Sequence, residues 1–145
     1  MLVILREVIN TRLKRLEKAL QILHQSGKIG LKELTGNDVL LSAVERNFQV
    51  AIECILDIGN HIIAEKGFES PDDNEDIIRI LGDEGVLPPD FAGSIKGMAG
   101  FRNILVHGYT KVDYELLYDY LARRLNDLRE FAGHISAYLD KEGYK

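Results

Sequence analysis

The chain has 145 residues, 46% of them hydrophobic, and a net charge of −5. This length suits one domain, residues 1–145, and the apolar content argues against disorder. A single cysteine excludes an internal disulfide framework and a multi-cysteine zinc site, and it fits a reducing compartment.

A first helix is predicted from the N-terminus to the glycines at 27 and 30. Its apolar residues recur every three or four positions, as on one face of an amphipathic helix: Leu2, Leu5, Ile9, Leu13, Leu16, Leu20 and Leu23. The apolar start, residues 1–5, is too short for a signal peptide. No run approaches the ~18 apolar residues that a membrane span needs. We therefore expect a cytoplasmic protein with no membrane segment.

The longest predicted helix follows the turn L34-T-G-N-D38, which also supplies its N-cap. Its apolar residues alternate at three and four positions until Gly67: Leu41, Val44, Phe48, Ala51, Ile55, Ile58 and Ile62. Cys54 lies in the same apolar stretch, and we expect it to be a small buried residue.

Most of the negative charge falls between residues 69 and 90. This segment has eight acidic residues and one arginine, a net −7, which leaves the rest of the chain at +2. Nucleic-acid binding by the rest of the chain is therefore not excluded. Ser70 and Pro71 predict a cap and first-turn proline for a short helix to about Leu81. We interpret the acidic segment as a solvated loop with this short helix.

Two more helices complete the predicted fold. Pro89 can open a fourth helix that runs to Gly108, and the last helix extends from near Asp113 to about Leu139. No strand pattern is present. The sequence thus predicts an all-α protein, an antiparallel bundle of four to five helices.

An arginine occupies a core position in the fourth helix. Ile95, Met98, Arg102 and Leu105 share one stripe by their spacing. A guanidinium is not neutralised at any ordinary pH, so a buried one needs anionic or hydrogen-bonding partners. Two glycines at positions 97 and 100 precede it, and they are either merely tolerated or needed for close approach of a backbone or ligand.

His107 stands at the end of the same helix, just before Gly108. A helix C-terminus favours the charged imidazolium, and histidine already titrates near neutrality. Asn103 lies four residues earlier, where it could orient the ring. Arg102 and His107 differ by about 140° around the helix and ~7.5 Å along it. If they are a catalytic pair, they converge most easily across a symmetric homodimer with a composite cleft.

A polar line on the second helix faces away from its apolar seam, at Arg46, Glu53, Asp57 and Asn60. It is either a solvated face or a support for the dimer cleft, with Glu53 or Asp57 pairing Arg102 and His61 nearby. A second set of basic residues, Lys111, Arg123, Arg124 and Arg129, is either a solvated helix face or a track for an RNA backbone. No cluster of acidic and histidine residues has metal-ligand spacing, so no metal is expected.

The run R102-N-I-L-V-H-G-Y109, late in an all-helical chain, resembles the R-x4-H-x-Y signature of HEPN-domain proteins. It is most similar to the HepT-like toxins that are encoded beside a minimal nucleotidyltransferase (MNT) antitoxin. The second helix, V44-E-R-N-F-Q-V-A-I-E-C-I-L-D-I-G-N-H61, also resembles that family.

The resemblance implies a metal-independent ribonuclease on a homodimeric helical bundle, with no cofactor. It places Arg102 and His107 in the catalytic pair, Asn103 beside them, and RNA as the substrate. It also makes Tyr109 the acceptor of AMP, which the MNT partner would transfer from ATP to silence the toxin. These roles suit the chemistry, since RNA cleavage needs a proton shuttle and a cation for the phosphorane charge.

Two other functions are compatible with the same residues. The chain could be a non-catalytic HEPN module that binds a nucleotide or RNA, or a partner subunit that docks on the nucleotidyltransferase and receives its modification.

Overall fold

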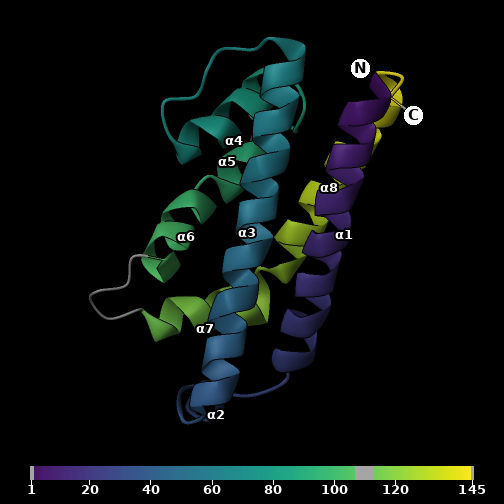
Figure 1. The fold of residues 1–145 in the computed structure, drawn as a ribbon. Helices are drawn as coiled ribbons and strands as arrows, with labels where there is room; N and C mark the ends of the chain where they lie inside the picture. Colours follow the sequence, from purple (N-terminus) through teal and green to yellow (C-terminus); the bar gives the residue numbers. More distant parts are fainter. Residues whose placement is uncertain (1, 107–112, 145) are drawn as a thin grey trace.

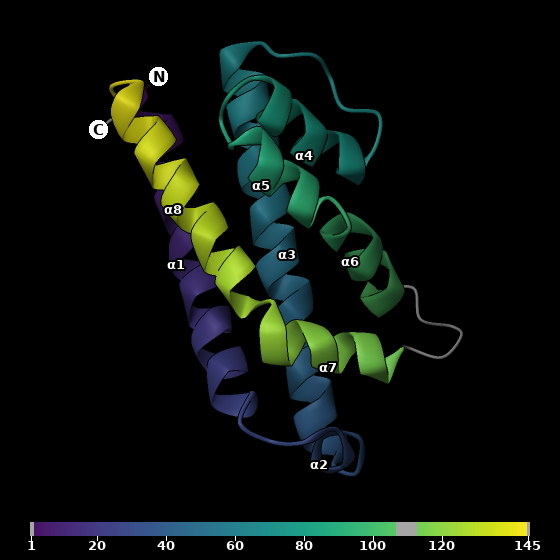
Figure 2. The same cartoon turned by 180° about the vertical axis from the view of Figure 1, so that it is seen from behind.

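Three long helices form the body of the protein. The computed structural model describes residues 2–106 and 113–144. In these residues α1 (Leu2–Ser26) runs antiparallel to α3 (Asp38–Lys66) and to α8 (Leu125–Lys141), and both termini lie at the same end (Figures 1 and 2). The predicted all-α fold is confirmed, since the described secondary structure is entirely helical.

Shorter helices complete the fold around α3. A single turn of helix, α2 (Leu31–Thr35), precedes α3. Then α4 (Asn74–Asp83), α5 (Pro89–Ile95) and α6 (Met98–Val106) descend along α3, and α7 (Tyr114–Arg123) crosses below them (Figure 1). Of the helices described, none is both long enough and apolar enough to cross a membrane.

Several predicted helix ends are confirmed by their capping geometry. The Asn37 side chain accepts a hydrogen bond from the Leu40 amide at 3.1 Å and caps α3. Gly67 closes the same helix with φ 68°, a left-handed conformation that glycine adopts readily. Pro89 is the first residue of α5, and Asp113 caps α7 by accepting from the Leu116 amide.

Three predicted boundaries are wrong. Ser70 and Pro71 do not open the helix of the acidic segment, because the Asp73 carboxylate caps α4 three residues later, accepting from the Asp76 amide at 2.9 Å. The fourth predicted helix is two helices, α5 and α6, separated at Lys96 and Gly97. The last predicted helix is likewise broken, at Arg124 between α7 and α8.

The break at Arg124 has a tertiary cause. This side chain donates to the Ser94 carbonyl oxygen at 3.0 Å and to the Asp127 carboxylate at 2.6 Å. Its guanidinium also lies 5.0 Å from the ring centre of Tyr120. Arg124 therefore joins the α7–α8 corner to the end of α5.

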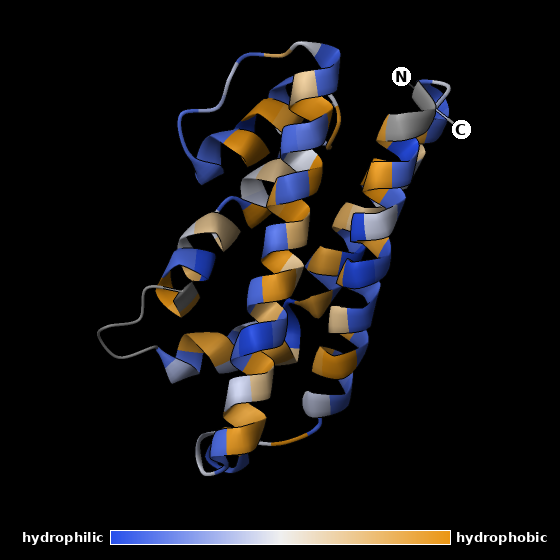
Figure 3. Ribbon diagram, viewed as in Figure 1, coloured by the Kyte–Doolittle hydropathy of each residue, from blue (hydrophilic) through white to orange (hydrophobic). Residues whose placement is uncertain are grey.

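Hydrophobic and hydrophilic residues alternate along the long helices (Figure 3), and the hydrophobic residues form a buried core between them. Fully buried residues from the long helices include Ile9, Leu16, Phe48, Ile55 and Phe131. Cys54 is 3% exposed and burial raises the pKa of its thiol, which confirms the interpretation of a small buried residue.

An aromatic cluster fixes α6 on the bundle. Phe101 of α6 stacks on Tyr120 of α7, with ring centres 4.1 Å apart, and meets the edge of Phe48 of α3 at 5.6 Å. All three rings are buried. Because Phe101 precedes Arg102 in the chain, this packing also sets the direction of the arginine.

Close contact between α3 and α4 depends on Gly59. A Cβ at this position would lie 2.5 Å from Cγ2 of Ile77 and 3.2 Å from Cδ1 of Leu81. We expect Gly59→Ala to lower the free energy of unfolding by about 1–2 kcal/mol, because overpacking outweighs the better helix propensity of alanine. Thermal or urea denaturation measures the change.

Gly133→Ala is the matched control, because this glycine is exposed in the middle of α8 and a Cβ there would meet no neighbouring group within 4 Å. It should stabilise the protein by up to ~1 kcal/mol. Equal stabilisation by both variants would contradict the close packing at Gly59.

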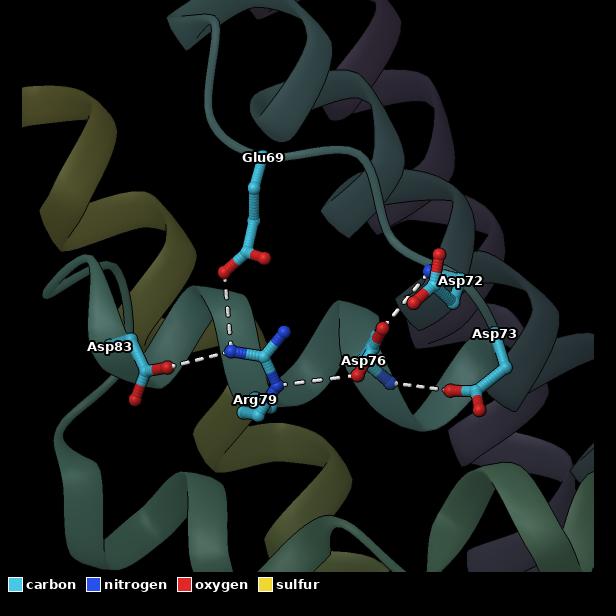
Figure 4. A network of polar contacts seen from close by, with 6 residues as sticks. All are labelled: Glu69, Asp72, Asp73, Asp76, Arg79 and Asp83. Carbon is cyan, nitrogen blue, oxygen red and sulfur yellow. Dashed lines mark hydrogen bonds and ion pairs between the residues drawn. The ribbon is translucent and has the colours of Figure 1, made fainter.

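Contacts within the acidic segment neutralise part of its charge. Arg79 forms ion pairs at 2.9–3.2 Å with Glu69, Asp76 and Asp83 (Figure 4). The Asp72 amide donates to the Asp76 carboxylate and, together with Arg79, holds the pKa of Asp76 below its ordinary value. The segment is a loop followed by α4, which confirms its interpretation as a solvated loop with a short helix.

Candidate active site on α3 and α6

Arg102 is partly buried and faces α3. Its Nη2 donates to Oε1 of Glu53 at 3.2 Å, and its side chain is 24% exposed. Gln49, one turn earlier on α3, donates to the same carboxylate oxygen at 3.2 Å. The predicted pairing of Arg102 with Glu53 is therefore confirmed. The pair holds a charged guanidinium in a defined position where solvent and ligands can still reach it.

Arg102 opens onto a groove with a volume of about 460 Å³. The groove lies across the polar face of α3 and is bordered by residues of α1, α4 and α6. Its charged and amide-bearing walls include Arg12, Arg15, Glu53, Asp57, Asn60 and Arg102. This volume lies in the range of sites that hold small organic ligands, and one nucleotide is a ligand of that size.

Asp57, the alternative partner predicted for Arg102, pairs with another arginine. Its Oδ2 accepts from Nε of Arg12 at 3.2 Å, across the α1–α3 contact. The polar line on α3 is thus more than a solvated face, because Glu53, Asp57 and Asn60 all line the groove. Arg46 and His61 are not among the lining residues.

The other residues of the predicted site are less constrained. Asn103 is exposed on α6, and within the part of the chain described it makes no side-chain hydrogen bond. A Cβ added at Gly100 would meet nothing within 4 Å, so among the described residues no backbone approaches it closely. Gly97 instead lies at the break between α5 and α6. His107 and Tyr109 fall outside the described residues.

Other basic residues named from the sequence lie away from this groove. Arg123 pairs with Asp119 on α7, and Arg124 is committed to Asp127 and Ser94. Arg123 and Arg129 border a separate hollow of about 240 Å³ near the end of α1. Lys111 falls outside the described residues.

Arg12 and Arg15 were not predicted to belong to the site. They lie on α1, far from Arg102 in the sequence, and only the packing of α1 on α3 brings them to the groove. Their spacing of three residues places both on one side of the first helix. That spacing was the available signal, but it did not indicate which element they would face.

Chemically, the groove presents three permanent cations beside neutral amide groups. Guanidinium groups bind phosphate oxygens through paired hydrogen bonds. An arginine that is already held by a carboxylate can stabilise charge on a phosphate with little reorganisation. The arrangement suits a phosphodiester ligand.

The sequence matches a known family over residues 4–135, described as ribonuclease HepT-like. The chain belongs to the HepT-like ribonuclease family. The mRNA nuclease HepT of Shewanella oneidensis is 26% identical over 125 residues, which cover 86% of this chain and 91% of the relative. The putative RNase YutE of Bacillus subtilis is 33% identical over 100 residues, 69% of each chain.

The HepT-like fold is also found among solved structures. A tri-AMPylated HEPN toxin of Shewanella oneidensis, in complex with its MNT antitoxin, superposes with a TM-score of 0.82. It is 23% identical, and the match covers 90% of this chain and 97% of that one. The resemblance to HepT-like proteins seen in residues 102–109 is therefore confirmed at the level of family and fold.

Proposed function

We propose that this protein is the toxin of a toxin–antitoxin pair, an endoribonuclease that cleaves RNA without a metal ion and is silenced by AMPylation. Membership of the HepT-like family supports the nuclease class. The observation that carries the site assignment is Arg102, which is fixed by Glu53 at the edge of a groove large enough for a nucleotide.

In the proposed reaction the ribose 2′-oxygen attacks the adjacent phosphorus. The bond from phosphorus to the 5′-oxygen breaks, and its electron pair stays on that oxygen. A base takes the proton of the 2′-hydroxyl, and an acid supplies a proton to the leaving 5′-oxygen. The products are a 2′,3′-cyclic phosphate and a 5′-hydroxyl, with no water consumed and no electrons transferred.

His107 is the proposed proton shuttle, since an imidazole near neutral pKa serves both steps. Arg102 is the proposed partner of the phosphorane oxygens, because its charge is permanent and its hydrogen bonds can be paired. Asn103 supports them as a polar neighbour. On an ideal helix, positions 102 and 107 would stand about 140° apart, and this spacing in the sequence favours a homodimer whose two copies complete each cleft.

The silencing step is a transfer of AMP from ATP to Tyr109. The phenol oxygen attacks the α-phosphorus, pyrophosphate leaves, and the phenol proton passes to a base of the MNT antitoxin. The tri-AMPylated state of the Shewanella toxin supports this proposal. Tyr109 is two residues from His107 in the sequence, and the attached AMP is proposed to compete with RNA for Arg102 and His107.

Removal of metal ions should leave RNA cleavage unchanged. The expected result is equal cleavage with and without EDTA, with products that carry 2′,3′-cyclic phosphate and 5′-hydroxyl ends, because the 2′-oxygen is the nucleophile. End-group analysis of a labelled RNA measures this. A His107→Ala protein purified identically controls for contaminating nucleases. Loss of cleavage in EDTA, or 5′-phosphate products, would contradict the mechanism.

A further inference from the structure

The groove contains more positive charge than the proposed chemistry uses. Arg102 accounts for the reacting phosphate, yet Arg12 and Arg15 line the same groove from α1. The two carboxylates at the groove are already paired, Glu53 with Arg102 and Asp57 with Arg12. Within the described residues, Arg15 has no ion-pair partner. Among the residues that the structure describes, Arg15 is therefore a cation at the groove without a counter-charge.

The existing ion pairs orient the arginines without occupying them fully. The Arg12 and Asp57 side chains are 34% and 55% exposed, and those of Arg102 and Glu53 are 24% and 35% exposed. Ion pairs that solvent reaches are screened and contribute little to stability. An incoming phosphate can share these guanidinium groups with the carboxylates at little cost.

Neutral amides line the groove on elements other than α1. They belong to Asn60 of α3 and Asn74, the first residue of α4. Carboxamides present both donors and acceptors, as the edges of unpaired bases do. A surface with cations on one wall and amides on another suits a single strand of nucleic acid, whose phosphates and bases lie on different sides.

We propose that the α1–α3 groove is a binding site for single-stranded RNA next to the reacting phosphate, with Arg15 and Arg12 holding a flanking phosphate. The site rests on the ribonuclease activity proposed above and deepens it, because it fixes the direction in which the strand leaves Arg102. It also predicts that the preferred substrate is an RNA longer than a dinucleotide.

The first test is binding of a short single-stranded 2′-O-methyl oligonucleotide, whose blocked 2′-oxygen prevents cleavage. Arg15→Gln should weaken binding about three- to tenfold at moderate salt. The binding constant should also fall less steeply with salt. The slope of its logarithm against the logarithm of the salt concentration should become about 0.7 less negative, the value for one phosphate contact on a single strand. Lys14→Gln is the matched control, since it removes a charge from α1 outside the groove.

The second test compares two substrates of the wild-type and Arg15→Gln proteins. A dinucleoside monophosphate has only the reacting phosphate, so its kcat/KM should fall much less than kcat/KM for a longer RNA, which should fall through KM. Equal losses on both substrates would place Arg15 in folding or catalysis and overturn the proposal.

Failures of the groove and of the proposed activity are distinguishable. If the protein binds the oligonucleotide through Arg15 but cuts no RNA, the groove is an RNA-binding site and the proposed nuclease activity is wrong. If the protein cleaves RNA but Arg15→Gln does not change oligonucleotide binding, the proposed role of the groove is wrong. The same holds if Arg129→Gln weakens binding instead. If Arg15→Gln leaves oligonucleotide binding intact but weakens association with a second copy or with the antitoxin, the groove is a protein interface and the proposal is wrong.

Discussion

Arg102→Ala is expected to reduce RNA cleavage by about 10²–10³-fold in kcat, because it removes the cation that faces the developing phosphorane charge. The fold should survive. The Arg102–Glu53 pair is partly exposed, and such pairs contribute only about 0.2–1 kcal/mol to stability. Single-turnover cleavage of a labelled RNA, together with a thermal melt of the same sample, measures both quantities.

Glu53→Gln separates positioning from catalysis. A glutamine keeps a side-chain oxygen that can accept from Arg102, so Arg102 stays near its place and the loss of activity should be far smaller. Arg102→Lys keeps the charge but loses the planar, two-pronged geometry, and an intermediate loss is expected. An Arg102→Ala protein that retains activity within a few-fold of wild type would remove Arg102 from the catalytic role.

Mixing two inactive proteins tests whether the cleft is shared between subunits. In a heterodimer of Arg102→Ala and His107→Ala chains, a composite cleft would combine an intact Arg102 from one chain with an intact His107 from the other. One site of the two would be complete, and up to about half of the activity should return. If each protomer holds its own complete site, no mixture regains activity.

The main helices could be predicted from the sequence because their signals are local. Apolar residues at intervals of three and four define the faces of α1 and α3, while Asn37, Gly67 and Pro89 mark ends through their own backbone preferences. The α7–α8 break is different. Leu121, Leu125 and Leu128 continue the helical period across it, and the corner depends on the contact of Arg124 with Ser94, thirty residues earlier in the chain.

The site shows the same division between local and tertiary information. Arg102 stood out because a charge at a core position needs a partner, and Glu53 was one of two carboxylates that the polar line of α3 offered. Only the position of Arg12 shows which carboxylate pairs with Arg102, because Arg12 forms an ion pair with Asp57. Arg12 and Arg15 themselves were missed because exposed arginines on an amphipathic helix are ordinary until a neighbouring helix makes them one wall of a groove.

Tyr109→Phe is expected to abolish silencing by the MNT antitoxin. Phenylalanine keeps the ring but lacks the phenol oxygen that would attack the α-phosphorus of ATP in the proposed transfer, so no AMP could be attached at position 109. After co-expression with the antitoxin, the wild-type protein should gain the mass of one or more AMP groups and lose RNA cleavage. The Tyr109→Phe protein should keep its unmodified mass at that peptide and continue to cleave RNA and arrest growth.

Tyr114→Phe is the matched control for this result. Tyr114 is the first residue of α7 and is 38% exposed, so it offers the antitoxin an accessible phenol five positions away. Its replacement should leave both modification and silencing intact. A Tyr109→Phe protein that the antitoxin silences as well as wild type would show that binding alone blocks the cleft. Silencing that depends on Tyr109 would mean that modification of this tyrosine, and not binding of the antitoxin alone, inactivates the protein.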